Sequence, residues 1–170
     1  ADIMIPGTGV TRSYSMANPP SERSTLSFLI KIYADGAFSS LLAKQLKVGD
    51  SVEIEGPFGT SFRNKKHDGA TLLVGGGSGM APLWSILNDL AESGAQQPVR
   101  LFYGAHAKKD LFYLDELVAI GERLEDFEFI PGLSELDPDD DWDGATGFIH
   151  EVVERSYVGA VQDDNLEAYA

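Results

Sequence analysis

The chain has 170 residues, 43% of them hydrophobic, which is enough to bury the core of one medium domain or of two small ones. Its 27 acidic residues outnumber its 13 lysines and arginines, and the resulting net charge of -14 argues against nucleic acid or an anionic membrane surface as a partner. The chain lacks cysteine, any apolar run of about 18 residues and a signal-peptide pattern, so we expect no disulfide, no thiolate metal site, no membrane span and a cytoplasmic location.

The first part of the chain has the pattern of a small antiparallel barrel. Short strands are predicted at residues 1–5, 12–15, 26–33 and 51–55, with one short helix at 39–46. Polar and apolar residues alternate in the last two of these strands, and Val52 and Ile54 are expected to point inward. Several short strands separated by Gly, Pro and Asn turns predict a partial antiparallel β-barrel over residues 1–63.

The polar, turn-rich segment at residues 64–69 is predicted to be a linker, and strands and helices alternate after it. Strands are predicted at 71–74, 99–103, 127–133 and 166–170, and the helices between them include 83–90, 110–124 and 148–157. In the second helix, the residues expected on the core face are Leu111, Leu114, Leu117 and Val118. This alternation predicts a parallel, doubly wound α/β domain over residues 70–170, with its ligand at the carboxyl ends of the strands.

A glycine-rich turn connects the strand at 71–74 to the helix that follows it. Four glycines occur within five residues, at Gly75, Gly76, Gly77 and Gly79, and Pro82 fits the first turn of the helix. Such a turn lets a diphosphate approach backbone N–H groups at the helix N-terminus. The Rossmann fingerprint and a Gly-x-Ser-x-Gly nucleophile elbow around Ser78 both fail at Met80, and no P-loop lysine follows. A tight turn without a ligand is the alternative.

Two further segments have residues suited to a phosphate-bearing cofactor. The strand Arg12-Ser13-Tyr14-Ser15 offers a guanidinium, a flat aromatic face and hydroxyl donors, although a surface strand could also have this sequence. The segment Gly36-Ala37-Phe38-Ser39-Ser40 places a turn glycine and serines at a helix start. That arrangement suits either an anion site or a plain N-cap.

Together these segments resemble the ferredoxin–NADP reductase superfamily, and the order of the motifs extends the resemblance over the whole chain. The motifs are Arg12-Ser13-Tyr14-Ser15, Leu29-Ile30-Lys31-Ile32-Tyr33, Gly36 to Ser40, Gly56-Pro57-Phe58-Gly59, Gly75 to Pro82 and Tyr103-Gly104. The sequences of the segments Ile5-Pro6-Gly7-Thr8 and Leu111-Phe112-Tyr113 are most similar to those in reductase components of bacterial methane and phenol monooxygenases. The resemblance implies a flavin-binding barrel followed by a nicotinamide-binding α/β domain.

The resemblance also implies roles for the residues of the flavin domain. Arg12 would hold the flavin pyrophosphate, Tyr14 would pack on the isoalloxazine, and Ser15 would bond near the hydride-accepting nitrogen, with Ser13 beside them. Lys31 and Tyr33 would contact the ribityl and phosphate region. The pyrophosphate cradle would be completed by Gly36, Phe38, Ser39 and Ser40. FAD is expected in preference to FMN.

In the nicotinamide domain, the resemblance implies that the segment Gly76-Gly77-Ser78-Gly79 takes the NADH diphosphate, with Ser78 near the nicotinamide ring. Met80 and Pro82 then match the superfamily's own version of the loop. Tyr14, Ser15 and Ser78 would take part in hydride transfer. Phosphate-reading relatives often have Arg at the position of His106, and an Arg fork is the better phosphate reader, so NADH is expected in preference to NADPH.

The expected function is an oxidoreductase that passes a hydride from NADH to flavin and electrons onward to an oxygenase or ferredoxin partner. A 2Fe–2S cluster needs four cysteines, so it would require a domain outside this chain. The scattered histidines suggest no metal site, and the missing barrel strands and Cys-Gly-Pro segment suggest an internal fragment of a longer reductase. The alternatives are a stand-alone cytochrome b5 reductase or flavohaemoglobin-type reductase, and a non-catalytic nucleotide-binding module.

Overall fold

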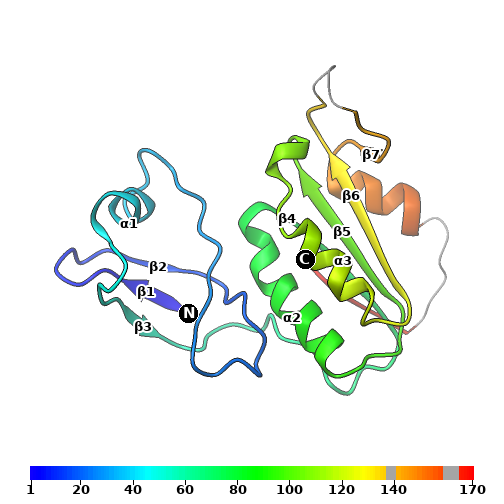
Figure 1. The fold of residues 1–170 in the computed structure, drawn as a ribbon, viewed down its shortest axis with the longest axis horizontal. Coiled ribbons are helices and arrows are strands. Elements are labelled where there is room, and N and C mark those ends of the chain that lie inside the picture. The colour runs from blue at the N-terminus through cyan, green and yellow to red at the C-terminus, as the bar shows by residue number, and fades with distance from the viewer. Residues whose placement is uncertain (137–140, 159–164) are drawn as a thin grey trace.

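A computed structural model of the chain describes residues 1–136, 141–158 and 165–170, and these residues form two lobes (Figure 1). The N-terminal lobe comprises residues 1–55 and has a three-stranded antiparallel sheet. The C-terminal lobe comprises the described residues from 70 onward and has a five-stranded parallel sheet with helices on both faces. The connecting segment, residues 56–69, joins them. The fold class expected from the sequence, a partial antiparallel barrel followed by a parallel α/β domain, is confirmed.

The sheet of the N-terminal lobe is small. Strand β1 (Asp2–Met4) lies between β2 (Thr11–Ser13) and β3 (Glu53–Glu55), and helix α1 spans Ser39–Gln45. The alternating segment at residues 26–33 does not form the expected strand, because its only ladder contact among the described residues is the bridge between Met16 and Phe28. This lobe therefore encloses a small core, in which Ile3, Ile5 and Phe38 are the buried members.

The sheet of the C-terminal lobe has the strand order β7-β6-β5-β4-β8. Its strands are β4 (Ala70–Gly76), β5 (Val99–Ala105), β6 (Phe127–Leu133), β7 (Ala145–Thr146) and β8 (Leu166–Tyr169). All four neighbouring pairs are parallel, so the carboxyl ends of β4 to β7 meet at one edge. The two-residue strand β7 is the one strand of this sheet that the sequence pattern did not predict.

Alternate residues of the central strands supply the two cores on either side of the sheet. Leu73 and Leu101 pack against α2 (Met80–Glu92) and α3 (Leu114–Gly121), whereas Leu72 and Phe102 pack against α4 (Ile149–Val153). In α2 the predicted core positions hold, since Leu83, Ile86, Leu87 and Leu90 are all buried. A π-type turn, η3 (Glu154–Val158), follows α4 within the helix predicted at 148–157.

The helix predicted at 110–124 is shorter, and the expected core face was wrong in part. A 3-10 turn, η2 (Lys108–Asp110), precedes it, and Tyr113 has a left-handed backbone with a φ of 63° directly before the helix. The helix that starts at Leu114 buries Leu117 and Ile120. Leu114 and Val118, expected in the core, remain 40% and 67% exposed.

Candidate functional site

A cleft of about 710 Å³ lies between the two lobes, at the carboxyl ends of β4, β5 and β6. The N-terminal lobe lines it with Phe28 to Lys31 and with Tyr33. The C-terminal lobe lines it with Gly76 to Ser78, Gly104 to His106, Asp110, Phe112, Ser134 and Gly147 to Ile149. The cleft therefore joins residues that sequence reasoning assigned separately to flavin and to nicotinamide.

The glycine-rich turn forms one wall of this cleft. Strand β4 ends at Gly76, a 3-10 turn, η1 (Gly77–Gly79), follows, and α2 starts at Met80. Gly76 faces Gly104 across β4 and β5, and a Cβ on Gly76 would collide with the Gly104 carbonyl oxygen. Gly77 has a φ of 52°, and no atom lies within 4 Å of where its Cβ would be. The turn thus exposes bare backbone at the start of a 13-residue helix, which fits a diphosphate group.

A row of small residues continues from Gly76 across the sheet. Gly76 is in register with Gly104, and Gly104 with Gly132. Ile149 of α4 lies over this row, because Cβ atoms on Gly104 or Gly132 would meet its side chain at 2.8 and 3.2 Å. The glycines let α4 lie close against the sheet at the edge where the cleft opens.

His106 lies just beyond the end of β5, on the rim of the cleft. Its Nδ1 atom is 3.2 Å from Oε1 of Glu135 and 3.4 Å from the hydroxyl of Ser134, both of which follow β6. Because the side chains of His106 and Glu135 are 63% and 76% exposed, this contact is open to solvent and contributes little to stability. An acidic group beside His106 repels a phosphate at this position.

The opposite wall and the base of the cleft are aromatic. Lys31 Nζ lies 5.5 Å from the centre of the Tyr33 ring, and both side chains are exposed to the cleft side of the N-terminal lobe. Phe112 packs edge-on against Tyr103 at 5.6 Å, and the Phe112 amide donates to the Tyr103 hydroxyl. Burial raises the pKa of Tyr103 to about 12, so its hydroxyl remains a neutral acceptor that fixes Phe112.

Tyr14 and Ser15 line a second cleft, also of about 710 Å³, together with Ser13 and Pro82. Tyr14 packs against Phe38 with ring centres 5.5 Å apart, and burial raises its pKa while the charge of Arg12 opposes that rise. The Ser13 hydroxyl donates to Asp2. The structure therefore separates these residues from the cleft at the carboxyl ends of the strands.

Arg12 is exposed on β2, where its guanidinium donates to the Thr11 carbonyl oxygen at 2.7 Å. In the Gly36 to Ser40 segment the Ser39 hydroxyl accepts from the Tyr33 amide at 3.1 Å, and Ser40 N donates to the Gly36 carbonyl. Phe38 and Met80 are buried, so that their side chains do not face a ligand site. Gly79, like Gly77, has open space at its Cβ position.

Several cleft residues were missed by sequence reasoning, notably Asp110, Ser134 and the residues from Gly147 to Ile149. The signal that could have found Ser134 is its position directly after a predicted parallel strand. Gly147 to Ile149 follow β7, which the sequence pattern did not reveal. Within residues 1–136, 141–158 and 165–170, no three His, Asp or Glu side chains form a group that could hold a metal ion.

Family models match both parts of the chain. The model of the oxidoreductase NAD-binding domain matches residues 73–170, and the model of the oxidoreductase FAD-binding domain matches residues 1–62. The chain therefore belongs to the oxidoreductase NAD-binding domain family and has an FAD-binding oxidoreductase domain before it. In the part of the chain that the structure describes, none of the helices is long and apolar enough to cross a membrane.

Two curated relatives illustrate the likeness. The chain is 45% identical over 135 residues to the reductase component of propane 2-monooxygenase from Mycolicibacterium goodii, and the match covers 79% of this chain and 39% of that relative. It is 32% identical over 158 residues to the phenol 2-monooxygenase reductase component DmpP from Pseudomonas sp. (strain CF600), covering 93% and 45%. The chain thus spans less than half the length of each.

Solved structures show the same architecture. The Amycolatopsis cytochrome P450 reductase GcoB matches with a TM-score of 0.85 and 28% identity, over 98% of this chain and 50% of that one. The ferredoxin reductase in carbazole 1,9a-dioxygenase matches with a TM-score of 0.80 and 30% identity, over 99% and 49%. The expected resemblance to ferredoxin reductases and to monooxygenase reductase components is confirmed.

Proposed function

We propose that the chain is the flavin- and nicotinamide-binding part of an NADH-dependent reductase that supplies electrons to an oxygenase or a ferredoxin. The observation that carries the proposal is the cleft between the lobes, in which Lys31 and Tyr33 lie across from the turn at Gly76 to Ser78. The names of the reductase-component relatives support the same conclusion. A cleft built from two cofactor-binding domains suits a transfer between two cofactors.

We propose that the flavin is FAD and that it binds along the N-terminal lobe. Arg12 would pair with the pyrophosphate, since among the described residues its exposed guanidinium bonds only to the Thr11 carbonyl oxygen. The backbone of Gly36, Phe38, Ser39 and Ser40 would complete the phosphate site. Tyr14 would pack on the ring system, and Ser15 would bond to it, with Ser13 beside them.

For NADH, we propose that the diphosphate binds at the turn Gly76 to Gly79, where the backbone is bare and α2 begins. Met80 would hold this turn by its burial in the core, and Pro82 would fix the first turn of the helix. Ser78, which lines the cleft, would donate to the nicotinamide. His106, held beside Glu135, would face a ribose hydroxyl in preference to a 2′-phosphate.

The bound flavin would supply the chemistry, by accepting a hydride and releasing electrons singly. The chain's contribution is geometry and exclusion of water. Lys31 and Tyr33 of one lobe and the turn at Gly76 to Ser78 of the other line one cleft, which would position the two cofactors for the transfer. Phe28, Leu29 and Phe112 make part of that cleft apolar and so keep water from the transferred hydride.

The proposed function also includes an assignment of the domain boundaries and of the cellular compartment. We assign residues 1–63 to the flavin domain, 64–69 to a linker and 70–170 to the nicotinamide domain, and the family matches at 1–62 and 73–170 support this division. A 2Fe–2S cluster would lie in a domain outside this chain. We propose a cytoplasmic location, where a chain without cysteines needs no oxidising environment.

The test is the absorption spectrum of the purified chain after addition of FAD. We expect bound flavin, recognised by quenched fluorescence, and its bleaching by NADH without oxygen. A chain that binds NADH but takes up no flavin would overturn the reductase proposal and support a non-catalytic nucleotide-binding module. Reduction of ferredoxin, but not of cytochrome b5 or a haem domain, would distinguish an oxygenase component from a stand-alone reductase.

A further inference from the structure

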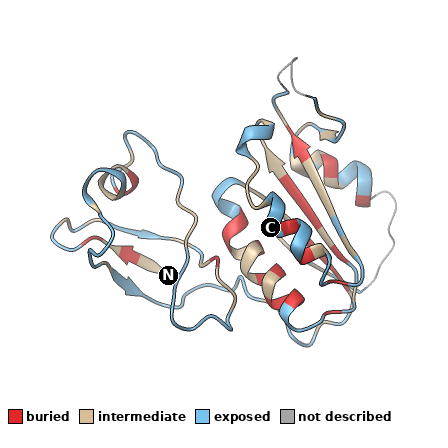
Figure 2. Ribbon diagram, viewed as in Figure 1, coloured by how far each residue is buried: buried red, intermediate tan, exposed pale blue. Residues whose placement is uncertain are grey.

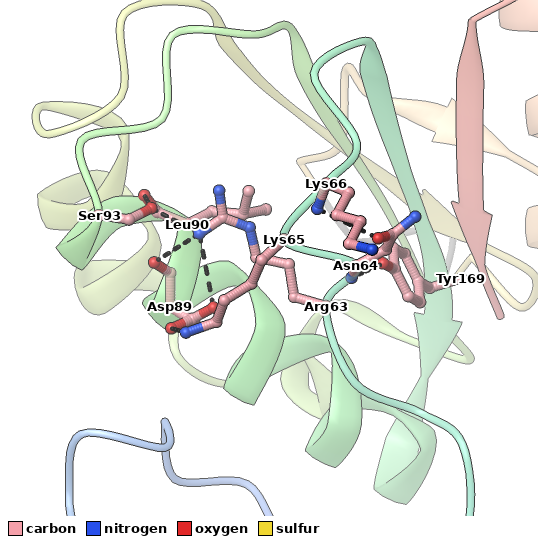
Figure 3. Close-up of polar contacts among 8 residues, drawn as sticks. All are labelled: Arg63, Asn64, Lys65, Lys66, Asp89, Leu90, Ser93 and Tyr169. Carbon is pink, nitrogen blue, oxygen red and sulfur yellow. Dashed lines mark hydrogen bonds and ion pairs between the residues drawn. The ribbon is translucent and has the colours of Figure 1, made fainter.

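The end of the connecting segment is held on the C-terminal lobe by a cluster around Arg63 (Figure 3). Arg63 Nη1 donates to the Asp89 carbonyl oxygen at 3.2 Å and to the Ser93 hydroxyl at 2.5 Å, and it lies 3.4 Å from Asp89 Oδ2. The side chains of Arg63 and Asp89 are only 15% and 12% exposed. This cluster of Arg63, Asp89 and Ser93, the Arg63 clamp, is therefore shielded from solvent and stronger than a surface ion pair.

The clamp is fitted to the end of helix α2. The Ser93 hydroxyl also donates to the Leu90 carbonyl at 2.9 Å, and Lys65 Nζ lies 3.7 Å from the second Asp89 oxygen. Arg63 thus donates to the Asp89 carbonyl in the last turn of α2, where the helix dipole favours a positive charge. These contacts of Arg63 are all made by one nitrogen, Nη1.

The residues after Arg63 are attached to the same lobe. The Asn64 amide donates to the Tyr169 hydroxyl of β8 at 2.9 Å (Figure 3), and His67 lies 3.9 Å from Glu167. Asn165 donates to Asp68 at 3.1 Å. Residues 64–69 link the two domains in sequence, and these contacts hold residues 63–69 against the C-terminal lobe.

Residues 56–62 differ from this fixed part. All seven are exposed, Gly56 and Gly59 have φ values of 157° and 88°, and the hydrogen bond recorded between backbone groups there is the local one from Phe62 to Thr60. Exposed segments with few tertiary bonds have the lowest local stability. The pivot between the lobes thus lies at 56–62, directly before the clamp.

Helix α2 connects this pivot to the proposed NADH site. Its N-terminus follows the Gly77–Gly79 turn, and Ser85, one turn before Asp89, donates to the Asn18 carbonyl of the N-terminal lobe at 2.8 Å. Ser85, Asp89 and Ser93 are spaced by four residues and so share one face of the helix. This contact between the lobes, the clamp and the glycine turn therefore all lie on or next to the same helix.

We propose that the Arg63 clamp is the positioning device that fixes the pivot at residues 56–62 against α2 and thereby sets the angle between the two cofactor sites. Arg63 and Asp89 line the second cleft together with Tyr14 and Ser15, but in this proposal the clamp acts through the orientation of the lobes. The inference rests on the proposed reductase function for its kinetic consequence, whereas its structural consequence can be measured without any cofactor.

The structural test uses the absence of cysteine, which allows two spin labels to be attached at Lys44→Cys and Glu122→Cys, both exposed and in different lobes. The distance distribution between the labels is measured by pulsed EPR for the unaltered chain, Arg63→Met and Arg100→Met. Arg100 is the matched control, because it is 20% exposed and pairs with Asp126 and Glu128 at the amino ends of β5 and β6. We expect the distance distribution to be broader in Arg63→Met than in the unaltered chain, and to be unchanged in Arg100→Met.

The kinetic test measures flavin reduction by saturating NADH in a stopped-flow instrument. We expect Arg63→Met to slow the reduction about tenfold with little change in the Kd of NADH, because a small misplacement of reacting groups is costly. Arg63→Lys should recover part of the rate. Should Arg63→Met fail to fold, Ser93→Ala removes one acceptor and should broaden the distribution to a smaller extent.

Equal distributions for the unaltered chain and Arg63→Met would overturn the proposal, and so would equal broadening in Arg100→Met. A chain that binds no flavin would instead contradict the reductase function, and the label distances would still decide the role of the clamp.

Discussion

The two lobes bury their side chains to very different extents (Figure 2). In the C-terminal lobe, Leu73, Leu87 and Val99 are fully buried within one cluster that α2, α3 and the sheet share. In the N-terminal lobe the corresponding cluster has Ile3, Ile5 and Phe38 as its buried members, and its strands are three residues long. Since burial of apolar area is the main source of stability, the C-terminal lobe should fold more stably than its neighbour.

The N-terminal lobe and the pivot also expose large apolar side chains. Ile32, Val48, Phe58 and Phe62 are at least 48% exposed. Binding of a ligand to a lobe of low stability raises its stability by mass action. We therefore expect the C-terminal lobe to be ordered before a nucleotide binds, and the N-terminal lobe to depend on its cofactor for rigidity.

The largest expected effect comes from the core of the C-terminal lobe. Leu87→Ala removes a fully buried side chain from α2 and should lower the free energy of unfolding by about 2–5 kcal/mol. Ile54→Ala is the matched change in the N-terminal lobe, where the side chain is 41% exposed, and should cost less than about 1 kcal/mol. Urea unfolding followed by circular dichroism measures both. Similar losses of unfolding free energy in the two variants would contradict the difference in stability that we expect between the lobes.

The second prediction concerns the flavin phosphate. Arg12→Ala should weaken FAD binding by about 10- to 100-fold, since hydrogen bonds to charged groups contribute about 1.5–3 kcal/mol. Fluorescence quenching of FAD measures the affinity, and NADH binding to the C-terminal lobe should not change. Arg23→Ala, at another exposed arginine of the same lobe, is the control. An unchanged FAD affinity in Arg12→Ala would remove Arg12 from the proposed site.

The elements predicted best from the sequence are those whose apolar pattern has only one interpretation. In α2 the residues Leu83, Leu87 and Leu90 recur at helical spacing, and all three are buried. The region before α3 has apolar residues in several registers, and the left-handed Tyr113 selects the one that exposes Val118. A local backbone conformation of this kind leaves no signal in the periodicity.

The prediction of a strand at 26–33 was wrong, and the prediction of the cleft was incomplete, for a different reason. Both features depend on contacts between residues distant in sequence. Alternation predicts which face a residue uses, but a strand also needs a neighbour, and Phe28 has only Met16 as its ladder partner among the described residues. Likewise, Ser134 reaches His106 only because β6 lies next to β5. The glycine turn could be found because its residues are consecutive.

The third prediction compares two glycines of similar conformation. Gly77→Ala and Gly94→Ala each place a Cβ in open space at a φ of 52° and 64°, and each should cost about 1–2 kcal/mol of stability. Only Gly77 lies on the cleft. Gly77→Ala should therefore also raise the Kd of NADH, measured by calorimetry, whereas Gly94→Ala should leave it unchanged. Equal NADH affinities in the two variants would mean that the diphosphate binds elsewhere.

The smallest expected effect concerns the choice between NADH and NADPH. We expect residues of the C-terminal lobe alone to determine this choice. His106→Arg should raise the use of NADPH relative to NADH, because a guanidinium fork can bind a 2′-phosphate. Glu135, now 3.2 Å from His106, would compete for that guanidinium, so we expect only about a fivefold change in the ratio of kcat/KM values, which is about 1 kcal/mol.

The double variant His106→Arg with Glu135→Gln removes that competitor and should change the ratio further. FAD affinity should stay constant in both variants, since neither residue belongs to the N-terminal lobe. A ratio that does not move in the double variant would show that the 2′-position is read elsewhere. A change in FAD affinity would show instead that the two lobes are coupled at the rim of the cleft.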